Sequence, residues 1–83
     1  MKQLSSIIIK EKKITIQTEL AQLPNPHIRT LAYIGGKILI KREQDIEPDL
    51  SQEKLQTLIS VQHVTVENEI KLKLYSLRTK KKE

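Results

Sequence analysis

The sequence predicts an α+β fold, a four-stranded antiparallel β-meander packed against one long C-terminal α-helix. Three observations lead to this prediction. Apolar and polar residues alternate between Ile14 and Leu20, which is the period of a half-buried strand. Gly35 and Gly36 tolerate the positive φ angles that a tight hairpin turn requires. After Asp49, apolar residues recur at steps of three and four, as they do on one face of a helix.

The first two strands are expected at residues 4–10 and 13–20. A two-residue turn at Glu11 and Lys12 would bring isoleucines of both strands onto one face. In that register Ile9 faces Ile14, and Ile7 faces Ile16. Because this turn contains neither Gly nor Asn, the register depends on the isoleucine pairing.

The next two strands are expected at residues 28–34 and 37–43, joined by a type I′ turn at the glycine pair. This turn would pair Tyr33 with Ile38, and Leu31 with Ile40, to form one apolar face. The same register would place Arg29 directly opposite Arg42.

The helix is expected from Leu50 to Leu77, with Asp49 as its N-cap and Gln52 three residues later, as in a capping box. Its apolar stripe comprises Leu55, Leu58, Ile59, Gln62, Val66, Ile70 and Leu74. Residues 63–75 also allow a second interpretation, because the β-branched run at 64–66 and the alternation at 70–74 are typical of a hairpin.

Both parts of the chain contribute to the predicted core. Its members are Ile7, Ile9, Ile14, Ile16, Leu31, Tyr33, Ile38, Ile40, Leu55, Leu58, Ile59 and Val66. With 83 residues and 9.6 kDa, the chain is expected to form a single small domain at residues 1–77. Residues 78–83 contain no apolar side chain and are expected to be a disordered basic tail.

The amino-acid composition excludes several classes of functional site. The chain has no Cys, which excludes disulfides, thiolate metal sites and cysteine nucleophiles. No apolar run approaches the roughly 20 residues that span a bilayer. The first residues do not form a secretory signal either. We therefore expect a soluble cytoplasmic protein without a membrane contact.

The residues that carry chemistry form no recognisable site. His27 and His63 lack metal-ligand spacing, and the acidic residues 43–49 lack the Gly and the terminal Glu of a calcium loop. No nucleophile motif is present, and Gly35-Gly36 is followed by a strand instead of the helix of a phosphate-binding loop. We expect no enzymatic activity, cofactor, metal or small-molecule substrate.

The length of the helix indicates a protein partner. From Leu50 to Leu77 it would span about 42 Å, which exceeds the size of a domain with a radius of gyration near 12 Å. Apolar residues on the half of the helix that extends beyond the sheet would then be exposed to solvent unless a partner buried them. The expected partner-binding residues are Val66, Ile70, Leu74 and Leu77. We expect a homodimer formed through this helix, or a larger protein partner.

The alternative is a nucleic-acid-binding accessory protein. The residues available to contact phosphates are Arg29, Arg42, Lys71, Lys73, Arg78, Lys80, Lys81 and Lys82. Without residues 78–83, however, the net charge falls from +5 to +2, and the chain has no Phe or Trp to stack on bases. We favour a tail that keeps the protein soluble as the explanation of these basic residues.

Overall fold

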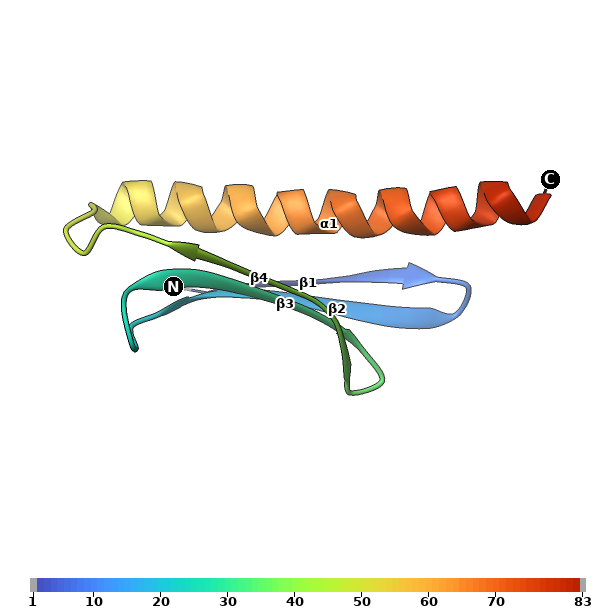
Figure 1. Cartoon of the computed structure of the whole chain (residues 1–83), viewed down its shortest axis with the longest axis horizontal. Coiled ribbons are helices and arrows are strands. Elements are labelled where there is room, and N and C mark those ends of the chain that lie inside the picture. Colours follow the sequence, from blue (N-terminus) through green and yellow to red (C-terminus); the bar gives the residue numbers. More distant parts are fainter. Residues whose placement is uncertain (1, 83) are drawn as a thin grey trace.

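A computed structural model describes the backbone of residues 2–82 and the side chains of residues 2–73. Four strands form one antiparallel sheet in sequential order, and a single helix lies across one face of it (Figure 1). The elements are β1 (Lys2–Ile9), β2 (Lys12–Ala21), β3 (His27–Ile34), β4 (Lys37–Asp45) and α1 (Gln52–Lys82). The predicted α+β meander with a long C-terminal helix is therefore confirmed.

The helix begins two residues later than expected. Ser51 is the N-cap, because its Oγ accepts a hydrogen bond of 3.3 Å from the backbone N–H of Lys54. The first intrahelical bond runs from Leu55 N–H to the Ser51 carbonyl at 3.0 Å. The capping role predicted for Asp49 was wrong. Residues 63–75 lie inside α1, so the chain does not adopt the alternative hairpin.

The turn between β1 and β2 consists of Lys10 and Glu11, which both have positive φ, 50° and 68°. This two-residue turn pairs Ile9 with Lys12, and Ile7 with Ile14. The predicted turn was one residue too late, so the predicted pairing was off by two positions. A shift of two keeps every side chain on its face, which is why the isoleucines still share one side.

The hairpin of β3 and β4 turns at Gly35 and Gly36, as expected, and pairs Tyr33 with Ile38. A β-bulge follows, because Ala32 pairs with Ile40 and Leu39 is left as the extra residue. Beyond the bulge the register differs from the prediction. Leu31 lies opposite Lys41, Arg29 opposite Glu43, and Arg42 opposite Thr30, so the predicted Leu31–Ile40 and Arg29–Arg42 pairs were wrong.

The core lies between α1 and the sheet face formed by Ile14 and Ile16 of β2, and Ile28 and Ala32 of β3. The buried side chains of α1 are Ile59, His63, Val66 and Ile70. Of the predicted core residues of β3 and β4, Ile40 is in the core at 8% exposed, whereas Leu31, Tyr33 and Ile38 are on the opposite face. Leu31 and Tyr33 are half-exposed on the side away from α1, and Ile38 is 62% exposed. Because side chains alternate along a strand, the choice of Ile28 and Ala32 for the core excludes Leu31 and Tyr33.

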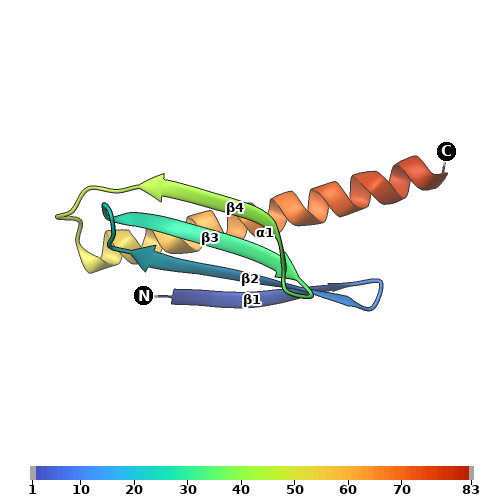
Figure 2. The same ribbon diagram turned by 60° about the horizontal axis from the view of Figure 1, so that its bottom comes forward.

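The helix is longer than the sheet that it covers (Figure 2). Its 31 residues correspond to about 46 Å, whereas a ten-residue strand spans about 33 Å. The C-terminal end of α1 therefore runs past the sheet, and the longest dimension of the molecule is 50 Å.

The β1–β2 turn yields a testable prediction. Glu11 adopts the left-handed conformation without being Gly, which costs about 1 kcal/mol or more. We expect Glu11→Gly to raise the free energy of unfolding by about 1 kcal/mol, measured by urea denaturation. As a control, Gly36→Ala, at φ 83°, should lower it. A loss of stability in Glu11→Gly would show that the side chain contributes more than the strain removes.

Candidate functional site

A buried polar network joins α1 to the sheet and contains most of the polar groups that lie in the core. His63 is at its centre and has no solvent exposure. Its Nδ1 lies 2.8 Å from Thr18 Oγ1 of β2, and its Nε2 lies 2.7 Å from Ser5 Oγ of β1. These contacts tie one helical residue to two neighbouring strands.

The network continues from both sides of the imidazole. Thr18 Oγ1 lies 2.7 Å from Thr30 Oγ1 of β3, which accepts a hydrogen bond of 2.9 Å from Gln62 Nε2. On the other side, Ser5 Oγ donates to Glu67 Oε2 at 2.7 Å. The chain of hydrogen bonds therefore begins and ends on α1 and crosses the three strands β1, β2 and β3.

The donor and acceptor in each hydrogen bond of this network can be assigned from its two terminal residues, Gln62 and Glu67. Ser5 Oγ donates its one proton to Glu67 Oε2, so His63 Nε2 must donate to the Ser5 oxygen. A neutral imidazole has one N–H, so Nδ1 accepts from Thr18. Thr18 then accepts from Thr30. All donors point from Gln62 towards Glu67, and each hydroxyl in the chain has both a donor and an acceptor partner.

The direction of these hydrogen bonds determines whether Ser5 could act as a nucleophile. A serine nucleophile needs a base that removes the hydroxyl proton. Here the imidazole of His63 donates to the Ser5 oxygen and the hydroxyl proton points to the Glu67 carboxylate, so no imidazole nitrogen is placed to remove that proton. The Ser5–His63 contact is therefore arranged to hold the helix on the sheet.

Burial and charge act on His63 in opposite directions. Burial lowers the pKa of His63 below its usual value because the protonated ring would lose its hydration, and the nearby Glu67 carboxylate raises it by a smaller amount. The Glu67 Oε2 atom lies 3.9 Å from His63 Nε2. The neutral ring is therefore the form that the folded protein favours.

Both arginines proposed to contact phosphates are paired with carboxylates. Arg29 donates to Glu19 at 2.7 Å across β2 and β3, and Arg42 donates to Glu69 of α1 at 2.8 Å. The Arg29 hydrogen bond and charge lower the pKa of the Glu19 carboxyl, against the opposing effect of burial. Arg29 points away from α1 and Arg42 towards it, so the structure does not bring the two together.

The expected partner-binding residues of the helix fall into two groups. Val66 and Ile70 are 1% and 3% exposed, because the sheet of the same chain covers them. The side chains of Leu74 and Leu77 lie outside the described range. Among the basic residues, Lys71 and Lys73 are exposed, whereas the side chains of Arg78, Lys80, Lys81 and Lys82 are not described.

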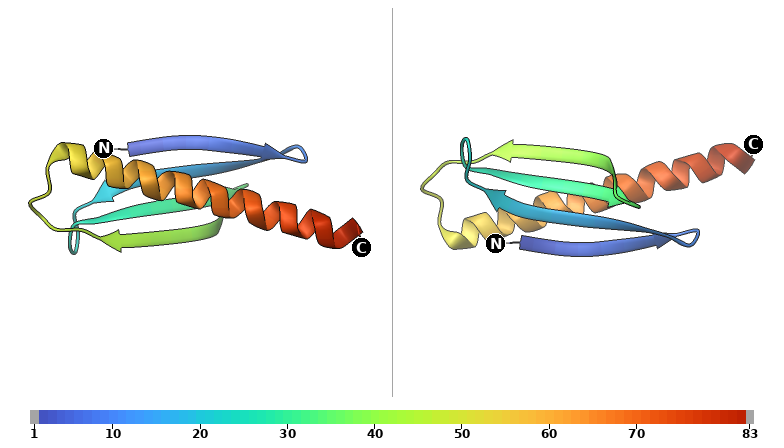
Figure 3. Two further views of the ribbon diagram at one scale, coloured as in Figure 1. Left: turned by 90° about the horizontal axis from the view of Figure 1, so that it is seen from above. Right: turned by 90° about the horizontal axis from the view of Figure 1, so that it is seen from below.

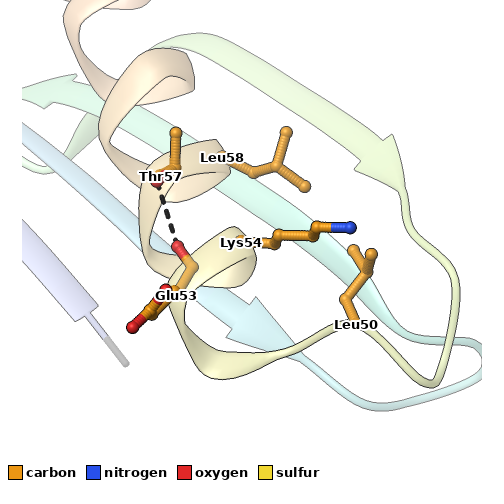
Figure 4. Close-up of a pocket in the computed structure, with 5 residues that line it drawn as sticks. All are labelled: Leu50, Glu53, Lys54, Thr57 and Leu58. Carbon is orange, nitrogen blue, oxygen red and sulfur yellow. Dashed lines mark hydrogen bonds between the residues drawn. The ribbon is translucent and has the colours of Figure 1, made fainter.

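Two open hollows lie along the surface of α1. One, of about 350 Å³, is lined by Leu50, Glu53, Lys54, Thr57 and Leu58 near the start of the helix (Figure 4). There the Thr57 hydroxyl donates back to the Glu53 carbonyl at 3.0 Å, and Lys54 extends beside the two leucines. The other, of about 330 Å³, runs between α1 and β4 and includes the Arg42–Glu69 ion pair. None of the residues around the first hollow is a buried polar group that could fix a ligand.

Within the part of the chain that the structure describes, no three His, Cys, Asp or Glu side chains gather closely enough to bind a metal ion. Over the same part, no helix combines the length and the apolar character that crossing a membrane requires. Comparison of the chain with protein-family models, with curated proteins and with solved structures finds no match. The function must therefore be argued from the geometry of the chain.

The buried network predicts a large effect from a small change. Thr18→Val keeps the shape of the side chain but leaves His63 Nδ1 and the Thr30 hydroxyl without their partner. We expect the free energy of unfolding to fall by about 1–3 kcal/mol in urea denaturation. The matched control is Thr15→Val, a half-buried residue on the other face of β2, which should change stability by less than about 0.5 kcal/mol. Equal effects at the two positions would contradict the network.

Stability should also depend on pH through His63. As pH falls below about 6.5, the unfolded chain binds a proton at His63 while the folded chain, with its lowered pKa, does not. The free energy of unfolding should therefore decrease as pH falls from about 7 through that value, and level off below the folded pKa. Glu19, whose pKa is also lowered, adds a separate loss only below about 4.5.

The control for this pH dependence is His63→Gln, which removes the titrating group. Unfolding free energies of both proteins, measured by urea denaturation between pH 8 and 5, give the comparison. The variant is expected to be less stable overall but to lose the decrease that begins near pH 6.5. If the variant keeps the same decrease, another group is responsible for it.

Proposed function

We propose that this chain is a non-enzymatic protein–protein interaction module, acting as a homodimer or bound to a larger protein. The observation that carries the proposal is the number of large apolar side chains left in contact with solvent. They are Leu4, Ile8, Leu23, Ile38, Leu39, Val61, Val64 and Leu72. Several share one surface, and extended apolar surfaces on small proteins mark binding sites for other proteins.

The small size of the chain supports the same proposal. A chain of 83 residues buries only about 60–65% of the surface that it exposes when unfolded. Among residues 2–82, the helix α1 covers one face of the four-stranded sheet and is the only element packed on that sheet. Association would bury apolar surface that the chain cannot cover by itself.

The inward orientation of the polar groups supports the non-enzymatic part of the proposal. His63, Ser5 and Thr18 are engaged with one another, and the imidazole is removed from solvent. An active site requires a reactive group beside a space that a substrate can enter. The hollow at the start of α1 contains none of these groups.

Nucleic-acid binding is the less well supported alternative. Arg29 and Arg42 are each bonded to a carboxylate, so a phosphate would have to displace Glu19 or Glu69. Exposed Lys71 and Lys73 remain available on α1. Phosphate contacts are strongest at low salt, so titration of labelled RNA and duplex DNA at about 50 mM salt decides this alternative.

The interaction function is tested by site-specific cross-linking. A photoreactive amino acid is introduced at Ile38 or at Leu72, which are 62% and 69% exposed, in the cells that make the protein. We expect discrete covalent protein adducts from at least one position. The matched control is the exposed polar residue Asn68, which should give far fewer. If none of the apolar positions yields an adduct above the Asn68 level, the proposed function is wrong.

A further inference from the structure

The sheet face that points away from α1 is uncovered and partly apolar; we call it the open face (Figure 3). Strand alternation and the burial pattern assign its residues. From β1 to β4 they are Lys2, Leu4, Ser6, Ile8, Lys13, Thr15, Gln17, Glu19, Ala21, His27, Arg29, Leu31, Tyr33, Ile38, Lys41, Glu43 and Asp45.

Four of the charged side chains on the open face form one ordered row across all four strands, and Lys13, Lys41 and Asp45 lie outside this row. The register places Lys2 beside Glu19, Glu19 beside Arg29, and Arg29 beside Glu43. The row therefore reads positive, negative, positive, negative from β1 to β4. It lies near the end of the sheet where β1 begins, so it forms a rim beside the apolar residues.

This order of charges is self-complementary. Read from β4 to β1, the same row is negative, positive, negative, positive, so a reversed copy opposes every charge with its opposite. A two-fold axis that lies between the two open faces and runs parallel to the strands produces this reversal. It places β1 of one copy over β4 of the other, and it keeps each row of side chains at the same position along the strands. Two-fold contacts between identical surfaces are the commonest form of oligomer.

We propose that the open face binds a second copy of this chain, face to face, with the helices on the outside. This inference rests on the proposed interaction function and names the partner and the surface. In the pair, Lys2 lies over Glu43 of the second copy, and Glu19 lies over Arg29 of the second copy. Aligned sheets pack in this way about 10 Å apart.

Part of the apolar surface of the open face lies close to the axis, where side chains of the two copies meet diagonally, while Leu4 lies over the aliphatic stem of Lys41 of the second copy. Leu31 and Tyr33 are on β3, one of the two strands beside the axis, so the pairs from the two copies cluster at the centre. Ile38 extends this cluster outwards on β4. Four strands spaced about 4.8 Å apart give a face of roughly 500 Å² per copy, or about 1,000 Å² in total, near the lower limit for a specific interface.

Arg29 provides a second observation. Its Nε atom is buried and has no hydrogen-bond partner among the described residues, although a terminal nitrogen of the same group bonds Glu19. A buried donor without an acceptor is uncommon in native proteins. A facing copy cannot reach the buried Nε itself, but the Arg29 side chain is 36% exposed, so the Glu19 carboxylate of the second copy would approach the accessible part of the guanidinium.

The first test compares two glutamate substitutions by sedimentation velocity over a range of concentrations. Ile38→Glu on the open face should weaken the dimer at least about ten-fold, because it places a charge in the apolar cluster. Leu72→Glu on α1 is similarly exposed and should leave the dimerisation constant within about two-fold. Circular dichroism of both variants checks that they fold.

The second test exchanges charges that can meet only between copies. Lys2 and Glu43 lie on the two edge strands, about 14 Å apart within one chain, so they are not in contact there. Lys2→Glu and Glu43→Lys should each weaken the dimer about five-fold, since each change acts at two symmetric places. Because Glu43→Lys also removes contacts with Lys41 and His27 of the same chain, circular dichroism checks its fold and recovery in the double variant is the decisive result. The double variant should return to within about two-fold of the wild type.

The outcomes separate this inference from the proposed function. A dimer that is insensitive to Ile38→Glu, or a charge exchange without recovery, overturns the open-face arrangement while a dimer remains. Dissociation by Leu72→Glu alone would assign the interface to the helix. A chain that remains a 9.6 kDa monomer at every concentration overturns the inference. The cross-linking experiment in cells then tests the proposed interaction function independently.

Discussion

The hydrogen-bond chain from Gln62 to Glu67 is the constraint on which the arrangement of helix and sheet depends. It crosses a region without solvent, where a donor or acceptor that loses its partner costs about 1–3 kcal/mol. Sliding or rotating α1 on the sheet would separate His63 from both Thr18 and Ser5 at once. Apolar contacts alone tolerate such movements, because they have no preferred direction. The polar chain therefore sets the position of the helix, and the isoleucines around it supply most of the burial.

The same constraint decides which face of the sheet is left uncovered. Both faces carry apolar side chains, but only one carries the two threonines that His63 and Gln62 can satisfy. Because α1, the only helix in the described part of the chain, covers that face, Leu31 and Tyr33 remain on the other side. The surface that we propose for association is thus a consequence of how the core satisfies its buried polar groups.

Charge is arranged differently on the two sides of the sheet. On the helix side, Arg42 reaches from β4 to Glu69, an ion pair that joins the edge strand to α1. On the open face, Arg29 and Glu19 belong to a row of alternating sign that runs from edge to edge. Exposed pairs of this kind contribute little to the stability of one chain, typically below about 1 kcal/mol. Their greater effect is on specificity, because only a partner with the reversed order meets no like charges.

The sequence alone determined the elements of this fold. The alternation at Ile14 to Leu20, the glycine pair at 35–36 and the helical period after Asp49 are local patterns, and local backbone preferences respond to them directly. Gln62 within the predicted apolar stripe and Thr18 on the apolar face of the Ile14–Leu20 alternation were the sequence signals of a buried polar site, and neither identified His63 as the centre. Tertiary structure decided the bulge at Ala32 and Tyr33, the face that became the core, and the burial of Thr18 and Thr30. These outcomes depend on partners up to 62 residues apart in the chain, as between Ser5 and Glu67, and no local pattern records which buried groups will find each other.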